Sequence, residues 1–135
     1  MNVYAALKFV HVVSATLLFG TGLGTAFFMW MTHRGGNIVA IRNAACLTVL
    51  ADWLFTTPAV IVQPLSGVWL MRLAGFPLTS SWLLASIVLY LFAGACWLPV
   101  VALQLRVRAL STTALHDGTP LPRAYFRCMH WWFAS

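Results

Sequence analysis

The sequence predicts an all-α integral membrane protein, a transmembrane helical bundle with three spanning helices and an incomplete or interfacial fourth. Of its 135 residues, 61% are hydrophobic and only 7% are charged. Ordinary soluble domains carry about 25% charged residues, so this chain has too few polar groups to cover a soluble globule. Its length suits one domain and no segment resembles a linker, so residues 1–135 are expected to form a single integral membrane domain.

The three spanning helices are predicted from three long apolar runs. These runs cover residues 3–31, 44–71 and 82–105. A helix needs about 20 residues to cross the hydrocarbon core, so each run is long enough to span with some tilt. Counting only histidine and the residues charged at neutral pH, the first run contains Lys8 and His11, the second contains Asp52, and the third contains none.

Residues 125–135 predict the start of a fourth helix. Trp131, Trp132 and Phe133 follow two arginines there, a pattern typical of the aromatic belt at a membrane interface. About ten residues cannot cross a bilayer. We therefore expect this helix to be truncated, to lie in the interface, or to be completed by another membrane subunit or a second copy of the chain.

Arginines in the connecting loops predict the orientation of the bundle. Loop one contains Arg34 and Arg42, loop two contains Arg72, and loop three contains Arg106, Arg108, Arg123 and Arg127. The positive-inside rule places loops one and three in the cytoplasm, so we expect a bacterial inner membrane with a periplasmic N-terminus. Nucleic acid is not an expected partner, because the arginines behind the net charge of +6 form no basic stripe.

Polar residues of all three predicted helices fall at one depth. Tyr4, Lys8 and His11 are spaced i, i+4 and i+7, so they share one helical face. With a rise of about 1.5 Å per residue, His11 lies ~12 Å from the outer end of its helix. Gln63 and Tyr90 lie equally far from the outer ends of their helices. We expect one polar layer in the outer half of the membrane, facing the bundle interior.

His11 is the candidate metal ligand of this layer, as an axial ligand of a haem iron, because imidazole nitrogen suits iron. Haem b is the expected cofactor, with Lys8 available to a propionate and with Gln63 and Tyr90 completing the cofactor-binding layer. No second histidine lies at this depth, so any second ligand has to come from another chain. The alternative for His11 is a structural hydrogen bond between helices, and no catalytic residue is identified.

Asp52 belongs to another layer, nearer the cytoplasm. It shares a face with Thr56 and needs a partner, such as that threonine, a tryptophan indole or an arginine of loop one. We expect it to carry a proton or to act as a structural polar group. The prolines of helices two and three remove backbone donors and are expected to free carbonyls near these sites: Pro58, Pro64 and Pro99.

Other residues that could react or bind a metal are interpreted as structural. Gly20 and Gly24 form a GxxxG spacing that favours close helix contact. The three cysteines are isolated and are expected to pack as small apolar residues. His33, His116 and His130 lie toward the cytoplasmic side, and their spacing matches no tight metal motif.

The longest motifs resemble a known family. They are LKFVHVV at 7–13, LLFGTGLGTAFFM at 17–29, ADWLFTTPAVIVQPLSG at 51–67, GFPLTSSWL at 75–83 and GACWLPV at 94–100. They resemble an uncharacterised bacterial family of predicted four-helix integral membrane proteins. More distantly, Lys8-x-x-His11 is similar to HemJ-type protoporphyrinogen oxidases and CopD-type membrane proteins. That likeness implies a haem-linked oxidation in which the lysine and histidine matter.

Two functions follow as hypotheses. The first is a haem b-associated redox protein with its site around Lys8 and His11. The alternative is a non-enzymatic accessory or assembly subunit of a larger membrane complex. Small-molecule transport is disfavoured because the layers of Asp52 and His11 are separated by mainly apolar residues.

Overall fold

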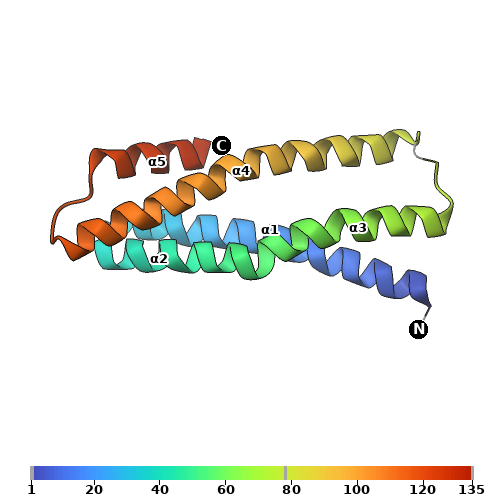
Figure 1. Ribbon diagram of the computed structural model, residues 1–135, viewed down its shortest axis with the longest axis horizontal. Helices are drawn as coiled ribbons and strands as arrows, with labels where there is room; N and C mark the ends of the chain where they lie inside the picture. The colour runs from blue at the N-terminus through green and yellow to red at the C-terminus, as the bar shows by residue number, and fades with distance from the viewer. Residues whose placement is uncertain (1, 78, 135) are drawn as a thin grey trace. The chain divides into compact units, whose positions relative to one another are not determined.

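The computed structural model describes residues 2–77 and 79–134, and among these residues it contains helices and no strand (Figure 1). The helices are α1 (Val3–Gly35), α2 (Ile38–Ala51), the π-helical turn η1 (Asp52–Thr56), α3 (Thr57–Ala74), α4 (Ser81–His116) and α5 (Arg123–Ala134). Because α2, η1 and α3 run on without a break, three helices are long and apolar enough to cross a membrane. The predicted number of spanning helices is therefore confirmed.

The helix ends differ from the predicted ones. The first helix continues to Gly35 rather than 31, the second begins at Ile38 rather than 44, and the third continues to His116 rather than 105. Hydropathy identifies only the part of a helix that lies in hydrocarbon. Arginine is a good helix former, so a helix can continue through arginines beyond its apolar segment. The predicted loops one and three are consequently much shorter than expected.

Glycines, not the loss of hydropathy, end the long helices. Gly36, Gly75 and Gly118 have φ values of 67°, 70° and 61°. This left-handed conformation costs glycine little and stops helix propagation. Asn37 then starts α2, because its side-chain oxygen accepts the backbone N–H groups two and three residues later at 2.9 and 3.2 Å.

The chain packs as two compact units. Unit 1 combines residues up to 23 with residues 51–90, and unit 2 combines residues 24–50 with residues from 91 onward. Unit 1 therefore holds the first part of α1 together with η1, α3 and the start of α4. Unit 2 holds the remainder of α1 and α4 together with α2 and α5.

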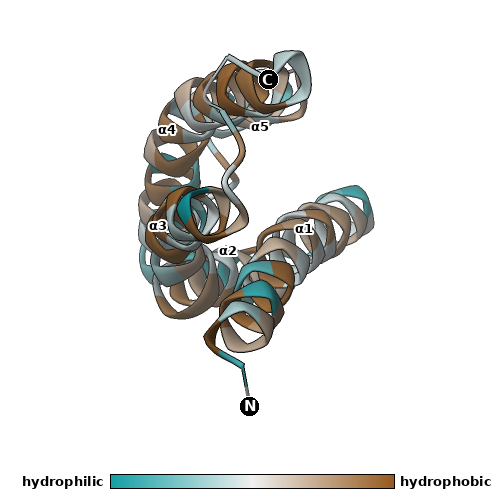
Figure 2. Ribbon diagram, turned by 90° about the vertical axis from the view of Figure 1, so that its right-hand side faces the viewer, coloured by the Kyte–Doolittle hydropathy of each residue, from teal (hydrophilic) through white to brown (hydrophobic). Residues whose placement is uncertain are grey.

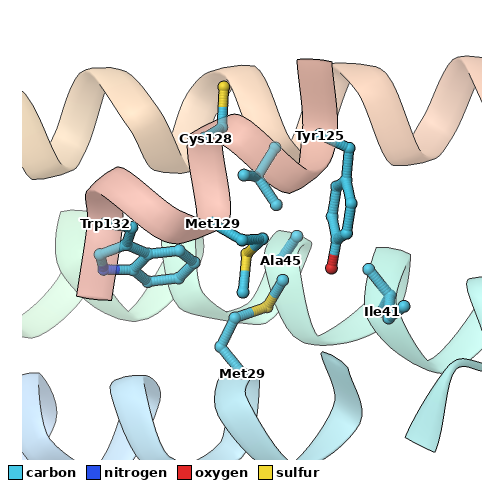
Figure 3. Close-up of a cluster of buried hydrophobic side chains, with 8 residues drawn as sticks. Met29, Ile41, Ala45, Tyr125, Cys128, Met129 and Trp132 are labelled. Carbon is cyan, nitrogen blue, oxygen red and sulfur yellow. The ribbon is translucent and has the colours of Figure 1, made fainter. Parts of the chain in front are cut away.

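The largest hydrophobic core lies in unit 2, where α5 packs against α1, α2 and α4. Its fully buried residues include Met29, Ile41, Val107, Tyr125 and Met129. Figure 3 shows the Met29 and Met129 side chains directed toward each other, with the Tyr125 ring pointing from α5 toward Ile41. The predicted fourth helix is thus present as α5, which begins two residues earlier than expected.

Most of the large apolar side chains are exposed rather than packed. Phe19, Phe92 and Phe9 expose 76%, 68% and 69% of their surface. Figure 2 shows apolar residues along all the long helices. In water such a surface would drive aggregation, whereas hydrocarbon solvates it. The exposure pattern therefore agrees with a bilayer as the solvent.

The expected close helix contact at the GxxxG spacing is not made by this chain. A Cβ atom added at Gly20 or Gly24 would meet no atom of the described residues within 4 Å, outside its own helix. Among the described residues, a side chain comes within 4 Å of an added Cβ in a spanning helix at Gly67 of α3 alone. Close helix contact at this spacing therefore stays a prediction about a helix of another chain or a second copy.

Candidate functional site

His11 joins α1 to α3 inside unit 1. Its Nδ1 lies 2.9 Å from Ser66 Oγ and its Nε2 lies 3.3 Å from Gln63 Nε2. Gly67 makes this approach possible, because a Cβ atom at this position would stand only 3.2 Å from the His11 Cε1. The imidazole therefore lies against the backbone of α3, with both nitrogens directed to side chains of that helix.

The direction of these hydrogen bonds fixes the tautomer of His11. Ser66 Oγ donates to the Val62 carbonyl at 2.7 Å, so its lone pair is left to accept from His11 Nδ1–H. In the neutral ring Nε2 is then an acceptor, and it meets the N–H of the Gln63 amide. Gln63 Oε1 in turn accepts from Ser14 Oγ. Four side chains, Ser66, His11, Gln63 and Ser14, are thus linked in one chain of polar contacts.

Sequence reasoning missed the two serines of this network. Ser14 and Ser66 are each only 4% exposed. Both stand three residues after a predicted site residue, Ser14 after His11 and Ser66 after Gln63. That spacing puts each pair on one helical face, so the signal was present. It was overlooked because only ionisable and amide side chains were placed by depth.

Tyr90 contacts α3 but not His11. Its hydroxyl donates to the Val60 carbonyl at 2.5 Å. Pro64 explains why this carbonyl is available, since the N–H four residues later would have bonded it in a regular helix and proline has none. The predicted release of a backbone carbonyl by a proline is therefore confirmed at this position, and the tyrosine replaces the missing donor.

Lys8 lies one turn before His11 and is exposed. It forms no hydrogen bond or ion pair with any residue that the structure describes. The structure thus brings His11 and Gln63 into contact, places Tyr90 on the carbonyl three residues before Gln63, and leaves the lysine ammonium accessible at the same end of α1. Whether these residues bind a cofactor stays a prediction.

Asp52 is buried at the first residue of η1, with 6% of its surface exposed. Its Oδ1 accepts from Thr56 Oγ at 2.8 Å, so the threonine is the partner among those expected. Its Oδ2 is buried and has no hydrogen-bond partner within the described part of the chain. The π-helical turn precedes Pro58, whose ring would clash with the carbonyl four residues earlier in a regular helix, and the wider turn relieves that clash.

His33, His116 and His130, which were expected near the cytoplasmic side, are not part of a group of described residues that could hold a metal. No group of three histidine, cysteine or acidic side chains stands close enough to hold a metal among residues 2–77 and 79–134. His116 is instead paired with Asp117 at 3.1 Å, and both are exposed. His33 bonds Tyr125 at 2.9 Å within unit 2.

Comparison with known proteins gives one match. A family model described as predicted integral membrane protein (DUF2269) matches residues 5–135. The resemblance to an uncharacterised family of predicted integral membrane proteins is therefore confirmed. No curated protein and no solved structure matches the chain. The more distant likeness to protoporphyrinogen oxidases and copper-resistance proteins is not shown.

Proposed function

Since the chain belongs to the DUF2269 family of predicted integral membrane proteins, a name that states no activity, we propose from its own residues that it is a haem b-associated redox protein. His11 would be the iron ligand through Nε2. The observation that carries the proposal is the hydrogen bond from His11 Nδ1 to Ser66 Oγ at 2.9 Å. Metal-binding histidines commonly donate their other ring N–H to an acceptor in this way, which fixes the tautomer and leaves the ligating nitrogen unprotonated.

The donor set fits a porphyrin better than a bare metal ion. His11 belongs to no group of three or more histidine, cysteine or acidic side chains among the described residues. One imidazole can hold iron only when most other ligands arrive with the metal, as they do in haem. When bound, haem supplies one-electron transfer at its iron.

The remaining residues would position the ligand and the cofactor. The Gln63 amide meets His11 Nε2 at 3.3 Å, beyond the usual length of a hydrogen bond, so moving it away costs little. Ser14 would keep the displaced amide oriented through its bond to Gln63 Oε1. The exposed Lys8 ammonium, one turn along α1, suits a propionate carboxylate.

Absorbance spectroscopy tests the proposal. We expect protein extracted gently from its native membrane to show a Soret band, and His11→Ala to abolish it. His116→Ala is the matched control, because His116 is exposed and lies in unit 2. Ser66→Ala should keep the band but weaken haem retention about tenfold or more, since loss of an outer-shell partner has that effect on other metal sites. Colourless, folded protein from a haem-replete membrane would refute the proposal.

We also propose that the protein lies in a bacterial inner membrane with its N-terminus periplasmic. Six of the seven arginines lie in unit 2, in the helices that flank the connections after α1 and α4, and only Arg72 lies in unit 1, near the connection after α3. A reporter active only in the periplasm should be active when fused before Asn2 and inactive when inserted at Gly36. The reverse pattern would contradict the orientation.

A second candidate function is a non-enzymatic subunit of a larger membrane complex. The observation that favours it is the open glycine stripe, since Gly20 and Gly24 leave room for another helix to approach closely. A stable partner, or a second copy, should then co-purify with the wild-type chain and be lost with Gly20→Leu. Recovery of a monomer alone from native membranes would exclude this function.

A further inference from the structure

A pocket of about 470 Å³ opens in unit 2 between the end of α1 and α5. This volume lies within the range of small-molecule sites. Its walls carry three aromatic rings and two imidazoles, from Trp30, His33, Phe126, His130 and Phe133. None of these residues takes part in the His11 network, so the pocket needs an explanation of its own.

The hydrogen bond between Tyr125 and His33 fixes what the pocket can recognise. Tyr125 is fully buried, and this burial raises its pKa to about 12, so the phenol keeps its proton at neutral pH. A buried O–H needs an acceptor, and His33 Nδ1 at 2.9 Å is its only partner among the described residues. The hydroxyl therefore donates to Nδ1, and the neutral imidazole carries its own proton on Nε2. His33 thus offers the pocket a hydrogen-bond donor and no metal-ligating lone pair.

The charge of unit 2 favours an anion at this donor. The unit contains six arginines, namely Arg34, Arg42, Arg106, Arg108, Arg123 and Arg127, and one acidic residue, Asp117. Arg34 stands next to His33 in sequence, and its guanidinium lies 5.1 Å from the centre of the Trp30 ring. Asp117 pairs with His116 and leaves the surplus positive charge unbalanced.

We propose that this pocket binds the phosphate headgroup of an anionic phospholipid. His33 Nε2–H donates to a phosphate oxygen, Arg34 supplies positive charge, and Trp30, Phe126 and Phe133 pack against the glycerol and upper acyl region. A lipid fits better than free phosphate because the aromatic walls would otherwise face water. The place also fits, since His33 and Arg34 form the last turn of the first spanning helix, where headgroups lie.

Native mass spectrometry of the full chain in a neutral detergent tests this proposal, with two probes: phosphatidylglycerol, and diacylglycerol, which lacks the phosphate. We expect phosphatidylglycerol to bind about tenfold more tightly, since a hydrogen bond to a charged group is worth about that much. His33→Phe should reduce the preference to about twofold, and His116→Phe, at an exposed histidine outside the pocket, should leave it unchanged. Arg34→Gln keeps the core intact and should also reduce it, which guards against a misfolded His33 variant.

Three outcomes would overturn the proposal. These are equal binding of the two lipids by the wild-type chain, a preference that survives both His33→Phe and Arg34→Gln, and a loss that His116→Phe reproduces. Inorganic phosphate that occupies the site in a His33-dependent manner while phosphatidylglycerol does not would assign it to a soluble anion instead. The result is independent of haem, because none of these variants touches His11.

Discussion

Tyr90→Phe offers the sharpest test of how unit 1 is held together. The substitution removes the hydroxyl that donates to the Val60 carbonyl at 2.5 Å and changes little else in shape. Because Pro64 has no N–H, the helix itself cannot satisfy that carbonyl after the change. An acceptor left unpaired in a buried site costs about 1–3 kcal/mol, although hydrogen bonds measured within membranes average nearer 0.6 kcal/mol. We expect a loss of about 1 kcal/mol in the free energy of unfolding.

The same reasoning predicts that the loss depends on the proline. In a Pro64→Ala background the alanine brings an N–H that can bond the Val60 carbonyl within α3. Tyr90→Phe should then cost close to nothing, so the double-mutant cycle should give a coupling of about 1 kcal/mol. The assay is reversible unfolding in mixed micelles, followed by circular dichroism. Tyr4→Phe is the matched control, since Tyr4 is exposed and its hydroxyl bonds none of the described residues. An equal cost in both backgrounds would refute the account.

Three further predictions use the same unfolding assay. Gly67→Ala should destabilise the chain, because it places a Cβ atom 3.2 Å from His11 Cε1, whereas Gly20→Ala meets no neighbouring atom and should not. Equal effects of the two substitutions would contradict the packing of the imidazole on α3. Asp52→Leu should leave stability unchanged or raise it, because the gain from removing the unpartnered Oδ2 offsets the lost hydrogen bond from Thr56; a large loss would show that Asp52 has a stabilising partner besides Thr56. Burial raises the pKa of Tyr125 from 10.0 to about 12, so its neutral phenol should stabilise the fold in full below pH 10 and lose this contribution as the pH rises through about 12. The two-unit shift corresponds to about 3 kcal/mol in the free energy of unfolding. Tyr125→Phe should flatten this alkaline loss of stability, and an unchanged pH profile would contradict the prediction.

Much of unit 1 could be predicted from composition and from the distance of each residue to the end of its helix. Every spanning helix crosses the same hydrocarbon thickness, so residues equally far from the outer ends are expected at the same level. Counting residues from the expected helix ends brought His11 level with Gln63, and their side chains are indeed in contact. The count could not give rotation about each helix axis. Tyr90 was therefore expected to face His11, but its hydroxyl donates to the Val60 carbonyl instead.

Unit 2 was harder to predict because its organisation depends on packing and not on hydropathy. The arginines near the ends of α1 and α4 led to a prediction of loops there. The backbone stays helical in both places until the chain reaches a glycine with positive φ, Gly36 after α1 and Gly118 after α4. The role of α5 was equally difficult to predict, since its sequence suggested only an interfacial aromatic belt. Its buried face, with Tyr125 and Met129, is recognisable only once α1, α2 and α4 are in place.

The two histidines of α1 show why residue type alone could not assign chemistry. His11 Nδ1–H donates a hydrogen bond to Ser66 Oγ, because the Ser66 hydroxyl itself donates to the Val62 carbonyl. His11 Nε2 is then an acceptor. His33 Nδ1 accepts a hydrogen bond from the Tyr125 hydroxyl, so the ring proton lies on Nε2, which is a donor. The two proposals follow from this difference: an unprotonated Nε2 suits a metal at His11, and an Nε2–H suits an anion at His33. The partner of the opposite ring nitrogen, which sequence does not reveal, decides between them.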